Sequence, residues 1–196
     1  AKPEGLIQQY ANNLRYSVFG YLNDSTATRD GGVMRAAQKY VGPKLYDQTN
    51  NTNKEWSTTD GTFIKNPDNI TTSMGVTIEN SGVINYINKF GELTTNNDKS
   101  YDPVSELYYT AIRYFKGMSS VASYSSYPNT NNSAQWSDGF PVISDWTGKD
   151  PITYSCQKNI ILGIGDTNSH KDKNLPSTEA TSSASEPTKP TEVVND

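Results

Sequence analysis

Residues 159–165 read NIILGIG, a nearly continuous apolar run set between polar stretches. A run of this length with polar flanks is typical of a strand that is buried on both faces inside a parallel sheet. Asp166 follows the run directly, and ligands of open α/β sheets bind outside the carboxyl ends of the strands. We therefore predict a buried strand that carries Asp166 to the rim of a cleft.

The sequence on either side of this run predicts amphipathic helices and further strands. The clearest helix is predicted over 103–116, where apolar residues recur every three or four positions and Gly117 can end the helix. The other predicted elements are helices over 4–13 and 81–91 and strands over 15–22 and 33–41, the last of which also has the composition of a short helix. Together they predict an α/β layered domain with a central, mostly parallel sheet, amphipathic helices and long polar insertions.

The composition limits both the core and the classes of function. Hydrophobic residues make up 33% of the 196 residues. Asn, Ser and Thr fill about a third of the chain and favour turns and loops. No apolar run is long enough to cross a membrane, and a net charge of −4 argues against nucleic-acid binding. A single His and a single Cys exclude a zinc finger and an internal disulfide.

The character of the chain changes after residue 176. Residues 177–196 are rich in Ser, Thr, Pro and Glu, and such a segment buries too little apolar area to order itself. We therefore expect one domain over residues 1–176, followed by a flexible loop or linker over 177–196.

Three oxygen-bearing residues are candidate metal ligands. Asp166 follows the predicted strand, and Asp102 and Ser105 begin the helix predicted over 103–116. Carboxylate and hydroxyl oxygens at a sheet edge are ligands that Mg²⁺ and Ca²⁺ accept. The alternatives are an Asx-turn at Asp166 and simple capping of the helix by Asp102.

Other polar and aromatic groups have both functional and structural interpretations. The pattern Asp24-Ser25-Thr26-Ala27-Thr28 presents several oxygens, and Asp138 with Asp145 is a carboxylate pair of the kind that hydrolyses glycosides. Trp136, Trp146 and the stretch 124–127 form either a sugar-stacking surface or a set of side chains that hold loops to the core. Cys156 is either a free buried thiol or half of a disulfide whose partner lies outside this chain.

Several segments in order resemble one protein family. The resemblance rests on RYSVFGYLND (15–24), GGVMRAAQKYVGP (31–43), SGVINYINKFG (81–91), YDPVSELYYTAIRYFKG (101–117) and CQKNIILGIGDTNSHKDKNLP (156–176). They are similar to the PilY/PilC family of type IV pilus assembly factors and pilus-tip adhesins. The resemblance implies an exported, non-catalytic protein of Gram-negative bacteria, at the cell surface, the pilus tip, the outer membrane or the periplasm. Its implied roles are pilus assembly, surface attachment and twitching motility, with minor pilins and host or abiotic surfaces as partners.

The resemblance also implies part of a von Willebrand factor A-like region, whose metal-ion-dependent adhesion site is built from three loops. The first loop would lie before Ala1, the second near Asp102–Ser105 and the third at Asp166. Hard cations need about six oxygen ligands, so we expect such an incomplete site to bind Mg²⁺ or Ca²⁺ weakly or not at all. With the first sheet strand missing, the hydrophobic face of 160–164 is expected to be partly uncovered and the chain poorly stable alone. The alternative function is a carbohydrate-active or carbohydrate-binding extracellular domain.

Overall fold

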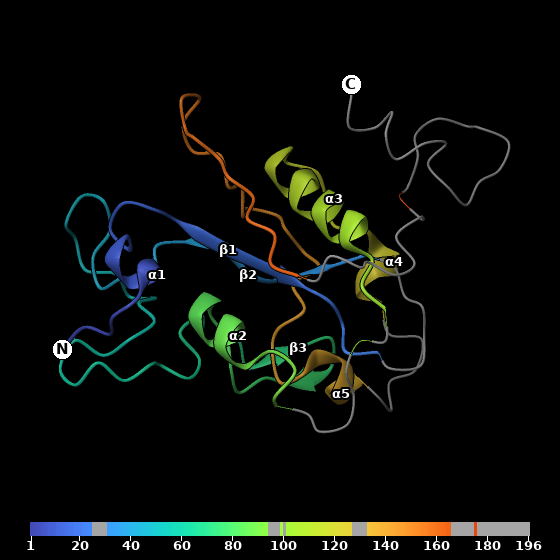
Figure 1. The fold of residues 1–196 in the computed structure, drawn as a ribbon, viewed down its shortest axis with the longest axis horizontal. Coiled ribbons are helices and arrows are strands. Elements are labelled where there is room, and N and C mark those ends of the chain that lie inside the picture. Colours follow the sequence, from blue (N-terminus) through green and yellow to red (C-terminus); the bar gives the residue numbers. More distant parts are fainter. Residues whose placement is uncertain (25–30, 94–98, 100, 127–132, 166–174, 176–196) are drawn as a thin grey trace, which may run out of the picture.

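The computed structural model describes residues 1–24, 31–93, 99, 101–126, 133–165 and 175 of the chain. These residues form a mixed α/β arrangement of short elements joined by long loops (Figure 1). The elements in chain order are α1 (Leu6–Gln9), β1 (Tyr16–Gly20), β2 (Val33–Lys39), β3 (Thr72–Ser73), β4 (Val76–Thr77), α2 (Val83–Lys89), α3 (Val104–Phe115), α4 (Ala122–Ser125) and α5 (Ser133–Ser137).

The β1–β2 hairpin is the centre of the fold, and both of its strands were predicted from the sequence. The strands pair antiparallel, so the short-helix alternative for 33–41 was wrong. Val18 pairs with Ala36 and the next residue, Phe19, pairs with Met34, which leaves Arg35 as an extra residue in β2. Such a bulge re-aims a side chain, and here it frees Arg35 from the ladder.

Helices cover the hairpin on both faces (Figure 1). On one face, Ala36 of β2 packs in a buried cluster with Val83 and Ile84 of α2. On the other face, Met34 packs with Tyr114 of α3 and with the ring of Trp146. β2 is therefore buried from both sides, as a central strand is, although it belongs to a sheet of only two strands.

The predicted helices over 4–13, 81–91 and 103–116 are confirmed as α1, α2 and α3, the first of them much shorter than expected. Gly91 and Gly117 follow α2 and α3 with φ of 77° and 65°, a left-handed conformation that glycine adopts without strain. The buried face of α3 carries Glu106 and Thr110 besides Ala111 and Tyr114. The apolar stripe of this helix is thus only partly turned inward, because polar side chains also lie in the interior.

The central parallel sheet was a wrong prediction for the described part of the chain. Both sheets there are antiparallel and two-stranded, and no von Willebrand factor A-like fold is present among these residues. Residues 159–165 form no strand, and their side chains are mostly exposed rather than buried. The apolar run shows that burial is favourable, but no described strand lies beside it to form a sheet.

Buried asparagine side chains hold the long polar loops in place. Asn51 donates from Nδ2 to the carbonyl oxygens of Tyr40 and Gly42, at 2.8 and 2.7 Å. Asn85 donates to the carbonyls of Ile64 and, at 2.8 Å, of Ser81. Backbone groups of a buried loop need such partners, so the high Asn content serves the fold itself.

Candidate interaction surface

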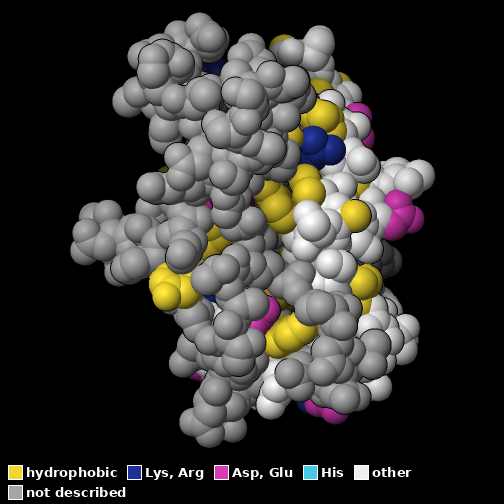
Figure 2. Space-filling view, turned by 90° about the vertical axis from the view of Figure 1, so that its right-hand side faces the viewer, with side chains coloured by type: hydrophobic (Ala, Val, Ile, Leu, Met, Phe, Trp, Pro, Cys, Tyr) yellow, Lys and Arg dark blue, Asp and Glu magenta, His cyan; other side chains and the backbone are white. Residues whose placement is uncertain are grey.

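The predicted metal ligands do not form a site in the described residues. Asp102 and Ser105 lie half-buried at the start of α3, whereas Asp166 lies outside the described residues. The described residues hold no group of three or more His, Cys, Asp or Glu side chains able to bind a metal. On the face shown in Figure 2, the carboxylates stand apart from one another. Asp102 and Ser105 offer at most three side-chain oxygens, well short of the roughly six that a hard cation needs.

The carboxylates considered for hydrolysis are engaged in local structure. Asp138 is buried, and its Oδ2 accepts a hydrogen bond from the backbone N–H of Gly91. Asp145 is exposed and accepts a hydrogen bond from the N–H of Thr147, at 2.9 Å, which lowers the pKa of Asp145. Asp24 is buried, and residues 25–28 of its oxygen-rich pattern lie outside the described residues.

The aromatic residues considered for sugar stacking are interior residues. Trp136, Trp146 and Tyr124 are all buried, and residue 127 lies outside the described residues. Trp146 donates from Nε1 to the carbonyl of Ile143 at 2.9 Å. The structural interpretation is therefore confirmed for these three side chains, because each holds a loop against the core.

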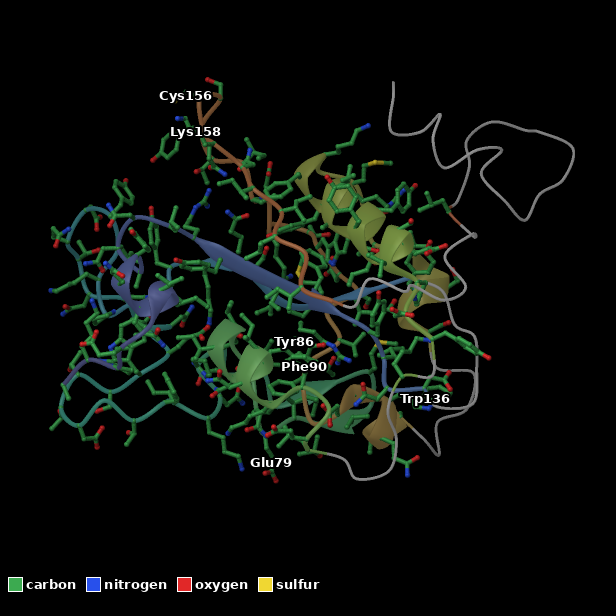
Figure 3. The ribbon with its side chains drawn as sticks, in the orientation of Figure 1. Glu79, Tyr86, Phe90, Trp136, Cys156 and Lys158 are labelled. Atoms are coloured by element: carbon green, nitrogen blue, oxygen red, sulfur yellow. The ribbon has the colours of Figure 1, made fainter. Side chains whose placement is uncertain are left out.

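A buried arginine at the centre of the fold was not predicted from the sequence. Nη1 of Arg35 donates to the carbonyls of Ser137 and Pro141, at 3.0 and 3.2 Å, and Nη2 donates to the carbonyl of Tyr21. Its guanidinium carbon lies 5.5 Å from the ring centroid of Tyr86, which Figure 3 labels on α2. The sequence signal that could have revealed it is a charged residue between the apolar residues Met34 and Ala36 of β2. Arg35 binds backbone carbonyls and is therefore structural.

A second buried charge, Glu55, caps α2. Its Oε1 and Oε2 accept hydrogen bonds from the N–H groups of Val83 and Ile84, at 2.8 and 2.7 Å. Lys39 of β2 lies 2.9 Å from the same carboxylate and also pairs with Asp68. A carboxylate at a helix start satisfies free N–H groups and complements the helix dipole. These buried charges stabilise the fold, so we expect the functional contacts of this chain on its surface.

A loop near the end of the described chain projects from the body of the molecule. Arg15 anchors its base, donating from Nη2 to the carbonyl of Pro151 at 2.7 Å and to Oγ1 of Thr153 at 3.1 Å. Gln157 closes the loop through its own hydrogen bond from Nε2 to Pro151, at 2.9 Å. Figure 3 shows Cys156 at the far end, away from the helices. Cys156 is exposed, so its interpretation as a buried thiol was wrong, and a disulfide with another chain stays a prediction.

Three tyrosines gather beside this loop and form what we call the tyrosine cluster: the exposed Tyr46 and Tyr154 and the half-buried Tyr40. Tyr46 is 63% exposed and Tyr154 is 59% exposed. The ring centroids of Tyr40 and Tyr46 lie 6.3 Å apart. A side-chain hydrogen bond with Tyr154 raises the pKa of Tyr46, and the nearby Asp47 acts in the same direction. This cluster was not predicted from the sequence, because Tyr154 lies more than 100 residues from Tyr40 and Tyr46.

Residues 159–165, which we call the apolar arm, run on from the loop in an exposed position. Ile160, Leu162 and Ile164 are 82%, 80% and 81% exposed. Among the described residues they are the most exposed of the large hydrophobic side chains. Exposed apolar groups gathered in this way mark interaction sites.

Comparison with known proteins decides the family. Residues 19–195 match the family described as "PilY1 homolog, second domain". The chain belongs to this PilY1 family. It is also 50% identical, over 206 aligned residues, to a protein of Xylella fastidiosa (strain Temecula1) named "Type IV pilus biogenesis factor PilY1 homolog". That match covers all of this chain and 17% of the relative.

Membership of the PilY1 family confirms the resemblance, but only a small part of the relative's length is represented here. No solved structure matches this chain. Within the described residues, no helix is both long and apolar enough to cross a membrane. The roles of the tyrosine cluster and the apolar arm are therefore inferred from their own geometry.

Proposed function

We propose that this chain is the second domain of a longer, exported type IV pilus biogenesis factor that works without catalysis. The 50% identity to a pilus biogenesis factor over the whole chain carries the proposal. The structure is consistent with it, because Arg35, Glu55 and Asp138, all buried, bind backbone groups. We assign to the intact protein the support of pilus assembly, surface attachment and twitching motility. Its partners are minor pilins and a host or abiotic surface, at the cell surface or pilus tip of a Gram-negative bacterium.

The test is genetic and biochemical. An antibody raised against this chain is used to probe pili that have been sheared from the cell surface. We expect the antigen in sheared pili of the wild type and its absence from that fraction in a strain lacking the major pilin. Deletion of the gene should abolish surface pili and twitching, and the wild-type gene should restore both. An antigen found only in the cytosol, or normal pili after the deletion, would refute the proposal.

A second candidate function, carbohydrate binding, is favoured by the tyrosine cluster rather than by the tryptophans first considered. Exposed tyrosine rings offer apolar faces with a polar edge, which suits sugar rings. The cluster therefore supplies the surface on which an adhesive role is proposed.

Substitution of both Tyr46 and Tyr154 by Ala separates attachment from assembly. We expect piliated cells that attach to a polysaccharide-coated surface several-fold less well than the wild type. The matched control is Tyr108→Ala, because Tyr108 is 53% exposed on α3. Equal attachment by the two variants would exclude the tyrosine cluster as the adhesive surface.

A divalent cation held by Asp166 together with Asp102 and Ser105 remains a separate proposal. Only Asp102 and Ser105 lie in the described part of the chain, and they do not make a site by themselves. No step of the proposed function depends on this cation.

A further inference from the structure

The apolar arm has the side-chain pattern of a strand but lacks a sheet. Ile160, Leu162 and Ile164 are each about four-fifths exposed, whereas Ile161 between the first two is half-buried. Alternate residues of an extended chain point to opposite sides, so this two-residue period is that of a β-strand. Ile160, Leu162 and Ile164 thus share the outward side of the arm, whereas its other side meets this domain only at Ile161, since Gly163 is exposed with open space around it.

The backbone of the arm is also unpaired within the described part of the chain. None of the hydrogen bonds made by the described residues involves an N–H or C=O group of residues 160–165. The segment carries no assigned secondary structure. A row of free N–H and C=O groups is a template on which another strand can pair.

The start of the arm is held in position before any partner arrives. Upstream, Arg15 fixes the loop through Pro151 and Thr153, and Gln157 donates to Oδ1 of Asn159 at 2.6 Å. The first residue of the arm is therefore tied to the anchored loop. Binding that requires little ordering loses less free energy, so such a segment is well suited to strand pairing.

The sequence of the arm shows no protection against unwanted pairing. Exposed strand edges in native proteins carry charged residues, Pro or bulges, and residues 159–165 contain no charged residue and no Pro. An unprotected edge that is apolar from Ile160 to Gly165 is consistent with a permanent partner rather than with open solvent. The remaining question is which partner covers it.

We propose that the apolar arm pairs with an edge strand of another domain of the same polypeptide. This inference rests on the proposed function, which places the chain within a longer protein. The relative has 83% of its length outside the match, since 100 − 17 = 83, and the family describes a second domain. A neighbouring domain therefore supplies a partner at high effective concentration. Strand addition bonds the backbone of the arm and buries Ile160, Leu162 and Ile164 against the neighbour.

The test is hydrogen–deuterium exchange, read by mass spectrometry, on the full-length protein. We expect the amides of residues 160–164 to exchange at least about 100-fold more slowly than in an unstructured peptide. Leu162→Asp should remove that protection while the amides of α3 stay protected, because the side chain of Leu162 lies outside the core. The matched control is Leu6→Asp, since Leu6 is 73% exposed on α1, and it should leave the arm protected.

Two results would overturn the inference. Rapid exchange of the arm in the wild-type full-length protein would show that no strand pairs with it. Protection that disappears on dilution would assign the partner to a second copy of the chain. Surface piliation is measured in the same strains, because it tests the proposed function separately. If the gene deletion abolishes pili but the arm exchanges rapidly in the wild-type protein, then the pairing is refuted and the proposed function still stands.

Discussion

β2 and the apolar arm invert the usual relation between sequence and burial. β2 carries a charged residue at its centre, yet Val33, Met34, Arg35 and Ala36 are all buried. The arm carries no charged residue, yet three of its side chains are the most exposed large hydrophobics of the described chain. β2 has β1 beside it and a helix on each face, and the arm has no neighbouring strand among the described residues.

The difference shows what an apolar run reports. Such a run indicates that burying its side chains is favourable, by about 25 cal/mol for each Å² of apolar surface. It does not indicate which other surface covers them. In β2 the neighbours belong to this chain, namely β1, α2 and α3, so the run is buried here. In the arm the neighbour is proposed to lie in another domain, so the same signal leads to an exposed segment here.

The largest effect is expected for Arg35→Met, which keeps the apolar stem and removes the guanidinium. The carbonyls of Ser137 and Pro141 would lose their buried donor, and we expect the free energy of unfolding to fall by about 3–5 kcal/mol. Unfolding by urea measures it. As a control, Arg15→Met should loosen the anchored loop and cost less than about 1 kcal/mol, because Arg15 is only half-buried. Equal costs would show that β2 does not depend on Arg35.

The same substitution at two leucines sharpens the comparison directly. Leu22 is 2% exposed in a buried cluster, and Leu162 of the arm is 80% exposed. We expect Leu22→Ala to lower the free energy of unfolding of the 196-residue chain by about 2–5 kcal/mol, because a cavity is left behind. Leu162→Ala should change it by less than about 0.5 kcal/mol. A large loss for Leu162→Ala would mean that the arm already packs within this chain.

These two regions also mark how far the sequence predicts the fold. Strands β1 and β2 and helices α2 and α3 were predicted because periodicity, turn residues and terminal glycines are local signals. The buried faces of α3 and β2 were less predictable, since both bury a charged residue, Glu106 and Arg35, and Arg35 bonds to residues distant in the sequence. The parallel sheet was wrong because one apolar run was taken to imply neighbouring strands that the described residues do not contain.

The candidate site was less predictable than the fold. Asp102 and Ser105 were chosen for their place at a helix start, but the described residues show no cluster around them. The tyrosine cluster is formed by residues 40, 46 and 154, which only the folded chain brings together. The exposure of the apolar arm has no signal in its own residues, because burial depends on the partner.

The next prediction concerns the response of the hairpin to high pH. Tyr86 packs against Gly20 at the end of β1, where a Cβ atom would collide with its hydroxyl group. Burial raises the pKa of Tyr86 above the value of 10.0 that it has in solution, although the nearby Arg35 opposes the shift. The stability that this provides is fully present below pH 10.0 and is lost as the pH rises through the higher pKa of the folded state.

We therefore expect the free energy of unfolding to fall above about pH 10, with a weaker dependence in Tyr86→Phe. The substitution also removes the hydrogen bond with Arg35, so its cost near neutral pH should be about 1 kcal/mol. Tyr108→Phe is the matched control, because Tyr108 is 53% exposed on α3 and its replacement should leave the pH dependence unchanged. An identical pH profile for wild type and Tyr86→Phe would exclude a role for Tyr86 in alkaline unfolding.

The smallest effect is expected from divalent cations. If Asp166, directly after the arm, shared a cation with Asp102 and Ser105, then the cation would tie the end of the arm to α3. Three candidate ligands supply too few of the roughly six oxygens that Ca²⁺ or Mg²⁺ needs, so millimolar additions should shift the melting temperature by less than about 1 °C. Asp102→Asn should melt like the wild type with and without the cation. A clear rise in the wild type that both Asp102→Asn and Asp166→Asn abolish would show that α3 does hold a cation, and that the arm has a partner within this chain after all.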